Sequence, residues 1–212
     1  MWKLNSGYAF LRYGIDVPLV KPYICDVSVD TESIPKPLRA DARRNREAIL
    51  KAARAIFSAR GREGHLEEVA RRAKVGMGTV YRHFPTKEAL LEALAREQFE
   101  LLTSWAREAQ ASPEPGAALE ALLWRGAEHQ ANDRALMEAV ADFKPSVARQ
   151  AEELHACMEQ LLHRAQAAGH IRADANAEDI PLMMCGLGSV MQMGGDGWRR
   201  YLTVMLDGMR AG

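Results

Sequence analysis

From residue 42 onward, apolar residues recur at the spacing of an α-helix, and glycines and prolines divide them into separate segments. Ile49, Ala53 and Phe57 illustrate the pattern, because residues four apart lie on one face of a helix. Gly61 ends this first segment, and the Ser-Pro-Glu-Pro-Gly run at 112–116 is the clearest later break. No alternating strand pattern follows residue 38, so the sequence predicts an all-α fold.

The breaks predict where each helix begins and ends. Thr86 is placed to cap one helix at its N-terminus, Gly169 to end another, and Asp179-Ile180-Pro181 to start the next. We expect helices over about 42–60, 66–73, 77–84, 87–108, 117–131, 133–143, 147–168, 180–193 and 198–209.

The charged residues are unevenly distributed along the chain. The formal net charge is zero, but residues 39–96 contain fourteen Lys and Arg against seven Asp and Glu, whereas residues 97–212 contain ten against seventeen. A basic segment attached to an acidic body is expected of a nucleic-acid-binding module on a separate core. We therefore expect a DNA-binding domain over 42–100 and a second helical domain over 101–212.

Residues 1–38 differ from the rest of the chain. Prolines at positions 18, 22, 35 and 37 exclude a long helix there. The segment fits an irregular, partly ordered N-terminal extension. It also fits an arm that packs on the body or on a partner subunit, because it contains the aromatic residues Tyr8, Phe10, Tyr13 and Tyr23.

Several classes of protein are disfavoured. Cys25, Cys157 and Cys185 are widely separated and form no Cys-x-x-Cys pair, so we expect no metal and no cofactor. No apolar run is long enough to span a membrane and no signal peptide begins the chain, so we expect no membrane partner and a cytoplasmic location. No Ser-His-Asp set or Gly-rich phosphate loop is placed to support catalysis, which argues against an enzyme.

Residues 66–87 carry the most specific chemical signal. Two short helices joined by Ala73-Lys74-Val75-Gly76 fit a helix-turn-helix, whose second helix enters the DNA major groove. Val80 and Phe84 can pack on the first of these helices, which leaves the opposite face free to read bases. The residues on that face are Gly78, where the backbone can approach DNA, Thr79, and Arg82, which can bond a guanine edge.

Other donors suit phosphate oxygens, which fix the register of a protein on DNA. Tyr81, His83 and Lys87 are of this kind, and Lys87 lies near a helix N-terminus, itself an anion site. Lys74 and a protonated His65 can add phosphate contacts. Arg44, at the start of the first helix, fits a phosphate contact and a solvated, charged helix start equally well.

Three runs combine around this motif: Arg46-Glu47-Ala48-Ile49-Leu50, Leu66-Glu67-Glu68-Val69-Ala70, and Gly78-Thr79-Val80-Tyr81-Arg82-His83-Phe84-Pro85-Thr86-Lys87. Together they resemble the TetR/AcrR family of bacterial transcriptional regulators, and the resemblance covers about 42–100. Trp198-Arg199-Arg200-Tyr201-Leu202 resembles the last helix of one branch of that family. The resemblance implies an all-α homodimer, with an N-terminal three-helix helix-turn-helix domain and a C-terminal helical domain for ligand binding and dimerisation.

Two positions depart from the family pattern. His65 stands where Ser or Thr often caps the second helix, so Glu68 supplies only half of a capping box. Lys74 stands where the turn often holds Gly, so a left-handed backbone at this residue would be strained.

The C-terminal domain holds candidates for an effector pocket and for the dimer interface. The pocket candidates are apolar, aromatic and histidine side chains on inward-looking faces, and core packing explains each of them as well: Trp105, Trp124, His129, Phe143, His155, Met158, Met183 and Met184. The resemblance implies an interface on the last two helices, although helix 180–193 also fits a simply buried core helix. The interface candidates are Met184, Leu187, Gly188, Met191, Trp198, Tyr201, Leu202 and Met205.

These patterns predict a DNA-binding transcriptional regulator. The resemblance adds a repressor that a small-molecule effector releases from a palindromic operator of double-stranded DNA. The alternatives are a regulator of the same fold without a small-molecule effector, and a helical metal-binding or enzymatic bundle.

Overall fold

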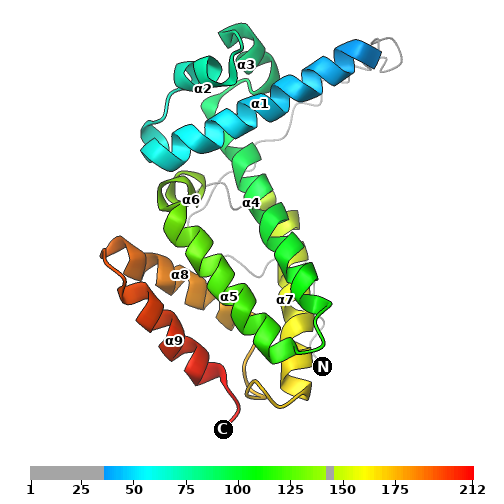
Figure 1. Cartoon of the computed structure of the whole chain (residues 1–212), viewed down its shortest axis with the longest axis vertical. Helices are drawn as coiled ribbons and strands as arrows, with labels where there is room; N and C mark the ends of the chain where they lie inside the picture. Colours follow the sequence, from blue (N-terminus) through cyan, green and yellow to red (C-terminus); the bar gives the residue numbers. More distant parts are fainter. Residues whose placement is uncertain (1–35, 142–145) are drawn as a thin grey trace, which may run out of the picture. The chain divides into compact units, whose positions relative to one another are not determined.

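The computed structural model describes residues 36–141 and 146–212, which are mainly α-helical (Figure 1). Within these ranges, extended backbone pairs only in a single antiparallel bridge between Ile171 and Arg210. The all-α prediction is therefore confirmed. The helices are α1 (Lys36–Arg60), the 3-10 helix η1 (Gly61–Glu63), α2 (Leu66–Ala73), α3 (Met77–His83), α4 (Lys87–Gln110), α5 (Pro115–Asn132), α6 (Arg134–Val140), α7 (Ala148–Ala167), α8 (Asp179–Gln192) and α9 (Gly197–Met209).

The observed helices follow the predicted segments, with one clear difference at the start. α1 begins at Lys36 instead of residue 42 and has Pro37 in its first turn. A proline is tolerated there because the first N–H groups of a helix have no partner within it. The predictions for residues 1–35 and for Phe143 lie outside the described residues.

A first hydrophobic core holds the helix-turn-helix together. It is formed by α1, α2, α3, the start of α4, and α6. α3 contributes Val80, which is fully buried, and Phe84 follows directly after its last residue. Both share this core with Leu66 and Val69 of α2, as the sequence predicted.

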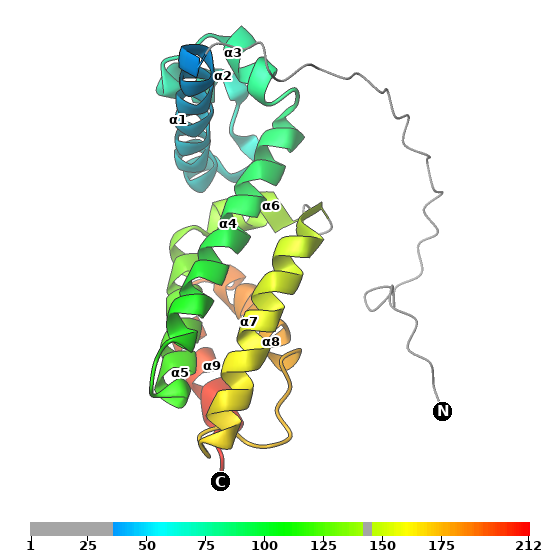
Figure 2. The same ribbon diagram turned by 90° about the vertical axis from the view of Figure 1, so that its right-hand side faces the viewer.

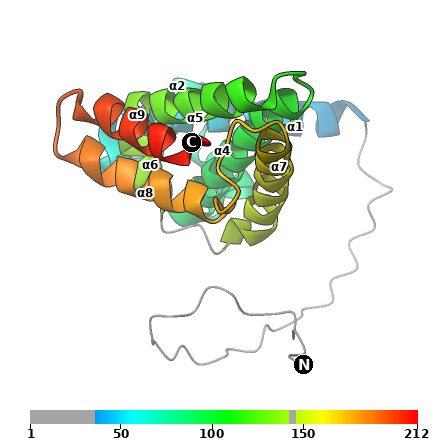
Figure 3. The same cartoon turned by 90° about the horizontal axis from the view of Figure 1, so that it is seen from below.

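A second core lies among α5, α7, α8, α9 and the second half of α4. Figure 2 shows α4 and α7 side by side, and Figure 3 shows α8 beside α9. Trp124 and Trp198 pack here with their ring centres 6.3 Å apart. The most deeply buried leucines of this second core are Leu119, Leu161, Leu162, Leu187 and Leu202.

α6 belongs to the first core although it follows α5 in the chain. Leu136, Ala139 and Val140 are buried there, and α6 contacts α1 and α4. η1 rests on α6: a Cβ placed on Gly61 would lie 3.5 Å from the carbonyl oxygen of Ala135. α4 and α6 are therefore the elements through which the helix-turn-helix is connected to the rest of the molecule.

The C-terminal end of α9 is fixed by backbone hydrogen bonds. Gly169 ends α7 in a Schellman motif, as predicted, with the His170 N–H donating to the Ala165 carbonyl at 3.0 Å. The next residues pair with the end of the chain: the Arg172 N–H donates to the Met209 carbonyl at 2.9 Å. The Ala211 N–H likewise donates to the His170 carbonyl at 3.1 Å, so these bonds hold α9 at its C-terminal end.

The turn between α2 and α3 contains a strained residue. Lys74 has φ 57° and ψ 41°, and it is the one non-glycine residue with positive φ in the described part of the chain. The Val75 N–H donates to the Ala70 carbonyl at 3.1 Å, which closes a Schellman motif that usually has glycine at the left-handed position. The strain anticipated from the sequence is therefore present.

We expect Lys74→Gly to raise the free energy of unfolding by about 0.5–1 kcal/mol, because glycine adopts positive φ without the Cβ clash but loses more entropy on folding. Urea denaturation measures this change. The matched control is Lys74→Ala, which removes the same charge but keeps the Cβ and should bring no such gain. Equal stability of the two variants would contradict strain at this position.

Candidate nucleic-acid interface and effector region

α3 has one buried face and one exposed face. Val80 has no exposed surface, whereas Tyr81 is 48% exposed, and Gly78 and Arg82 are exposed as well. A Cβ placed on Gly78 would meet nothing within 4 Å, so the backbone here is open to close approach. The helix thus offers one aromatic hydroxyl, one guanidinium and a bare stretch of backbone to a partner.

The C-terminal end of α3 is held by its neighbours. The Thr86 hydroxyl oxygen accepts the Ala89 N–H at 3.0 Å, so Thr86 caps α4 as predicted. The guanidinium carbon of Arg46 lies 5.2 Å from the centre of the Phe84 ring. This cation–π contact ties α1 to the end of α3.

His83 is half-buried at the end of α3, and Thr79 is half-buried one turn earlier. Burial, followed by the charges of Arg46 and Arg82, lowers the pKa of His83 below its ordinary value of 6.5. The imidazole is therefore neutral at neutral pH, when one ring nitrogen donates a hydrogen bond and the other accepts one.

Lys87, which was predicted to contact phosphate, has its side chain turned inward. Its ammonium group donates to the carbonyl oxygen of Arg62 and lies 5.6 Å from the centre of the Phe57 ring. The side chain is half-buried. In this position Lys87 braces the connection between α1 and α2, and it would have to swing outward to reach a phosphate.

The other predicted phosphate contacts lie on the surface. Arg44, which pairs with Asp41, is exposed, and so are His65 and Lys74. The Glu68 carboxylate accepts the His65 N–H at a long 3.5 Å, which is the glutamate half of the capping box expected from the sequence.

Two further cations on this surface were not among the contacts predicted from the sequence. Arg71 and Arg72 are exposed in the last turn of α2, directly before the turn that contains Lys74. Their position in the basic segment 39–96 was the one sequence signal that could have identified them as nucleic-acid contacts. With Lys74 and Arg82 they give the helix-turn-helix an exposed set of positive charges, which suits the phosphate backbone of a nucleic acid.

Two family models match the chain. Residues 49–94 match the bacterial regulatory proteins of the tetR family, and residues 114–211 match the C-terminal domain of SbtR-like transcriptional regulators. The TetR transcription regulatory protein from Mycobacterium vanbaalenii is 35% identical, with a TM-score of 0.64, over 82% of this chain and 100% of that one. The chain belongs to the TetR family. It is therefore a DNA-binding transcriptional regulator of all-α fold.

Another TetR-family structure is similar over most of its length. The regulator SCO0520 from Streptomyces coelicolor is 32% identical, with a TM-score of 0.60, over 78% of this chain and 98% of that one. No match was found among curated proteins. In the described ranges, no helix has the length and apolar character of a membrane span, and no three His, Cys, Asp or Glu side chains gather as metal ligands would.

Two of the predicted effector residues lie together in a polar cluster between α4 and α5. The Trp105 and His129 rings meet edge to face with centroids 5.4 Å apart, and His129 Nε2 lies 2.6 Å from Gln98 Oε1. Gln98 is only 4% exposed, and its Nε2 has no hydrogen-bond partner among the described residues. A buried donor without a partner costs free energy, and Gln98 Nε2 is such a donor. Gln98 was not among the effector residues predicted from the sequence.

The other predicted effector residues do not join this cluster. His155 lies with Nε2 4.0 Å from the Glu178 carboxylate, near the start of α8. Trp124, Met158, Met183 and Met184 belong to the second core or pack against it. Of the predicted effector residues, Trp105 and His129 are therefore the two that lie in one polar cluster, together with Gln98.

Four of the residues predicted for the dimer interface are buried inside the subunit itself. Leu187, Met191, Trp198 and Leu202 are at most 5% exposed and belong to the second core. Their side chains are covered by their own subunit, and an amphipathic pattern indicates that a face is buried without indicating which subunit buries it. The remaining four are half-buried: Met184, Gly188, Tyr201 and Met205.

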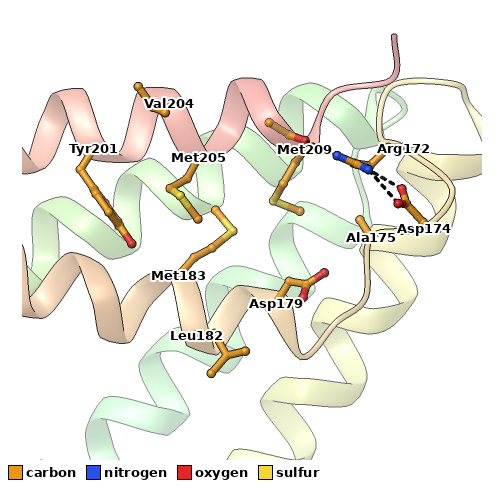
Figure 4. Close-up of a pocket in the computed structure, with 11 residues that line it drawn as sticks. Arg172, Asp174, Ala175, Asp179, Leu182, Met183, Tyr201, Val204, Met205 and Met209 are labelled. Atoms are coloured by element: carbon orange, nitrogen blue, oxygen red, sulfur yellow. Dashed lines mark hydrogen bonds and ion pairs between the residues drawn. The ribbon is translucent and has the colours of Figure 1, made fainter.

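Other apolar side chains are exposed on α8, on α9 and directly after the end of α8. Leu182 is 70% exposed, Met193 88% and Val204 51%. A groove of about 450 Å³ lies between α8 and α9 and includes Leu182, Tyr201, Val204, Asp174 and Asp179 in its lining (Figure 4). Exposed apolar side chains gathered in this way are a common feature of protein-association surfaces.

The His129 environment predicts how stability depends on pH. Burial lowers the pKa of His129 below 6.5, Asp133 raises it by less, and Arg54 lowers it further. The unfolded chain therefore binds more protons as the pH falls through about 6.5, and the free energy of unfolding should fall on the acid side.

Urea denaturation at about pH 7.5 and about pH 5.5 measures this loss, and His129→Gln should reduce it because glutamine does not titrate. His163→Gln, at an exposed position, is the control and should leave the loss unchanged. An equal loss in His129→Gln and the wild type would contradict the role of His129.

Proposed function

We propose that this regulator is a homodimeric repressor that binds a palindromic operator and is released from it by a small-molecule effector. The observation that carries the DNA-binding part is α3, which buries Val80 in the first core and exposes Gly78, Tyr81 and Arg82 on the opposite side. A helix packed on one side and polar on the other is what major-groove reading requires.

The roles of the exposed residues follow from their chemistry. Arg82 is the base-reading donor, because a guanidinium can form two hydrogen bonds to guanine. Thr79 and Gly78 allow close approach of the helix to the bases. The phosphate contacts are Tyr81, His83, Arg44, His65, Arg71, Arg72 and Lys74, with Lys87 joining them only after it leaves the Arg62 carbonyl.

Two copies are needed to read a palindrome, since each half-site takes one recognition helix. The exposed apolar residues Leu182, Val204 and Met193 support association through α8 and α9. We propose residues 42–100 as the DNA-binding domain and 101–212 as the effector and dimerisation domain, with α4 crossing the boundary. A regulator of this kind acts in the cytoplasm, where bacterial DNA lies.

The effector site we propose is the Gln98–Trp105–His129 cluster. Gln98 and Trp105 lie on α4, whose first residues contact the helix-turn-helix, and His129 lies near the end of α5, three residues before its last. A ligand that separated these side chains would shift α4 against α5. Because α4 and α6 both enter the first core, that shift would change the position of α3 and its spacing in the dimer.

The operator can be found by selection from random double-stranded oligonucleotides, and it should be an inverted repeat. On it, Arg82→Ala should lose about 1–3 kcal/mol of discrimination at one base pair per half-site, because a base-reading contact is lost. Tyr81→Phe should weaken binding to operator and unrelated DNA alike, by about fivefold, because a single phosphate hydrogen bond is lost. Fluorescence anisotropy measures both.

Glu100→Gln serves as the control, since this exposed residue of α4 lies outside the proposed contacts. A non-palindromic selected site would argue against two symmetric recognition helices. If Arg82→Ala and Tyr81→Phe both bind the operator as the wild type does, the proposal that α3 contacts DNA is wrong.

The effector proposal is tested by screening small aromatic and carbonyl compounds for release of the labelled operator. A true effector should bind about tenfold more weakly to Gln98→Met, which lacks the buried donor, while operator affinity without effector stays unchanged. Gln160→Met, at an exposed position on α7, is the matched control. If no compound releases the operator, the alternative of a regulator without a small-molecule effector gains support.

A further inference from the structure

The outward face of α9 is a narrow stripe that begins with a cation and ends with a glycine. Arg200, Val204 and Gly208 are spaced four residues apart and all three are exposed. The inward stripe of the same helix is already used by the second core, through residues such as Leu202 and Leu206. The described residues of the subunit therefore leave the outward stripe uncovered.

The two ends of this surface differ in charge. Arg200 forms no ion pair or hydrogen bond with a described residue through its guanidinium, whereas the adjacent Arg199 pairs with Glu128 at 3.5 Å. At the other end of the helix, Asp174 and Asp179 both line the groove. An unpaired cation thus stands at the N-terminal end of α9, and carboxylates gather at its C-terminal end.

The C-terminal end of α9 with Asp174 and Asp179, here called the acidic end, has fewer cations than carboxylates. Arg172 binds Asp174 through two hydrogen bonds of 2.6 and 2.7 Å, as drawn in Figure 4. Asp179 accepts the Asn176 N–H at 2.8 Å and has no ion pair among the described residues. Asp207 is already paired with Arg210 at 2.7 Å. Asp179 is therefore the carboxylate of this end that can accept a further cation.

Symmetry restricts how two copies of α9 can meet. In a twofold dimer, residue i of one subunit faces residue j of the other, and j faces i. A parallel arrangement would place Arg200 beside its own copy, which is repulsive. An antiparallel arrangement places Arg200 opposite the acidic end, which is attractive, so charge complementarity selects the antiparallel arrangement.

We propose that the groove between α8 and α9 is filled by a second copy of this chain, with the twofold axis passing close to Val204 and the partner subunit's Arg200 bound at the acidic end beside Asp179. The proposal rests on the homodimer proposed above and adds the register of its interface. It also accounts for the exposed apolar residues near the axis, Leu182 and Val204.

The dimensions of a helix pair fit this register. Arg200 and Gly208 each lie about 6 Å along the helix from Val204, at about 1.5 Å per residue. Packed helices lie about 8–10 Å apart, a separation that an extended arginine side chain can span. Gly208 has no side chain, and a Cβ placed there would meet nothing within 4 Å, so there is room for the incoming guanidinium.

A charge exchange tests the register, with dimer dissociation measured by sedimentation at a series of dilutions. Arg200→Glu should raise the dissociation constant of the dimer by about tenfold or more, because two attractive contacts become repulsive. Asp179→Arg should weaken the dimer similarly. The double variant Arg200→Glu with Asp179→Arg should restore association to near the wild-type value, since both contacts are then rebuilt with the charges exchanged.

Arg199→Glu is the matched control. It makes the same change of charge one residue away, but Arg199 pairs with Glu128 of its own subunit, so the dissociation constant should stay within about twofold of the wild type. Circular dichroism shows whether each variant is folded.

A cross-link provides a second measurement that leaves Asp179 intact. In a background with the native cysteines replaced by serine, Val204→Cys should form a disulfide between subunits under mild oxidation, because the two copies of this position meet at the axis. Thr203→Cys, on a neighbouring face of α9, should not.

The proposed register is overturned, while the homodimer stands, if the wild type is a dimer, Arg200→Glu leaves its dissociation constant unchanged and Val204→Cys forms no disulfide between subunits. A wild-type chain that is monomeric at micromolar concentration overturns the homodimer and the register together. Loss of association in Arg200→Glu, rescue in the double variant and a cross-link at position 204 are the results that the proposal requires.

Discussion

Burial of Val80 and Phe84 in the core formed with α1 and α2 determines which side of α3 faces outward. α3 is only two turns long, so its own hydrogen bonds do not hold it in isolation, and tertiary packing has to position it. The cation–π contact of Arg46 with Phe84 and the cap at Thr86 act on the same end of the helix. The exposed positions of Gly78, Tyr81 and Arg82 are consequences of that packing.

The sequence predicted most of the fold because periodicity and breaks are local signals. Gly61, Gly169 and the run at 112–116 each lie where a helix or its last turn ends. α3 was predictable in its orientation too, since only one of its faces is apolar. The left-handed backbone at Lys74 followed from the family pattern of its turn.

The sequence could not predict what depends on contacts between distant residues. The stripe containing Trp198 and Leu202 indicates burial equally well for a subunit core and for an interface, and only the packing distinguishes them. Lys87 has several possible partners, and its contact with the Arg62 carbonyl is twenty-five residues away in the chain. Gln98 became a candidate only because its amide is buried against His129, on a helix that periodicity alone describes as ordinary.

The two ends of the groove between α8 and α9 are not equally constrained. At the acidic end, backbone hydrogen bonds join His170 and Arg172, which lie between α7 and α8, to the last residues of the chain. At the other end, α8 passes into α9 through Gly194 and Gly195, both with positive φ and with no atom within 4 Å of a Cβ placed on them. The C-terminal end of α9 is therefore tied to the segment between α7 and α8, whereas its N-terminal end is joined to α8 through two glycines.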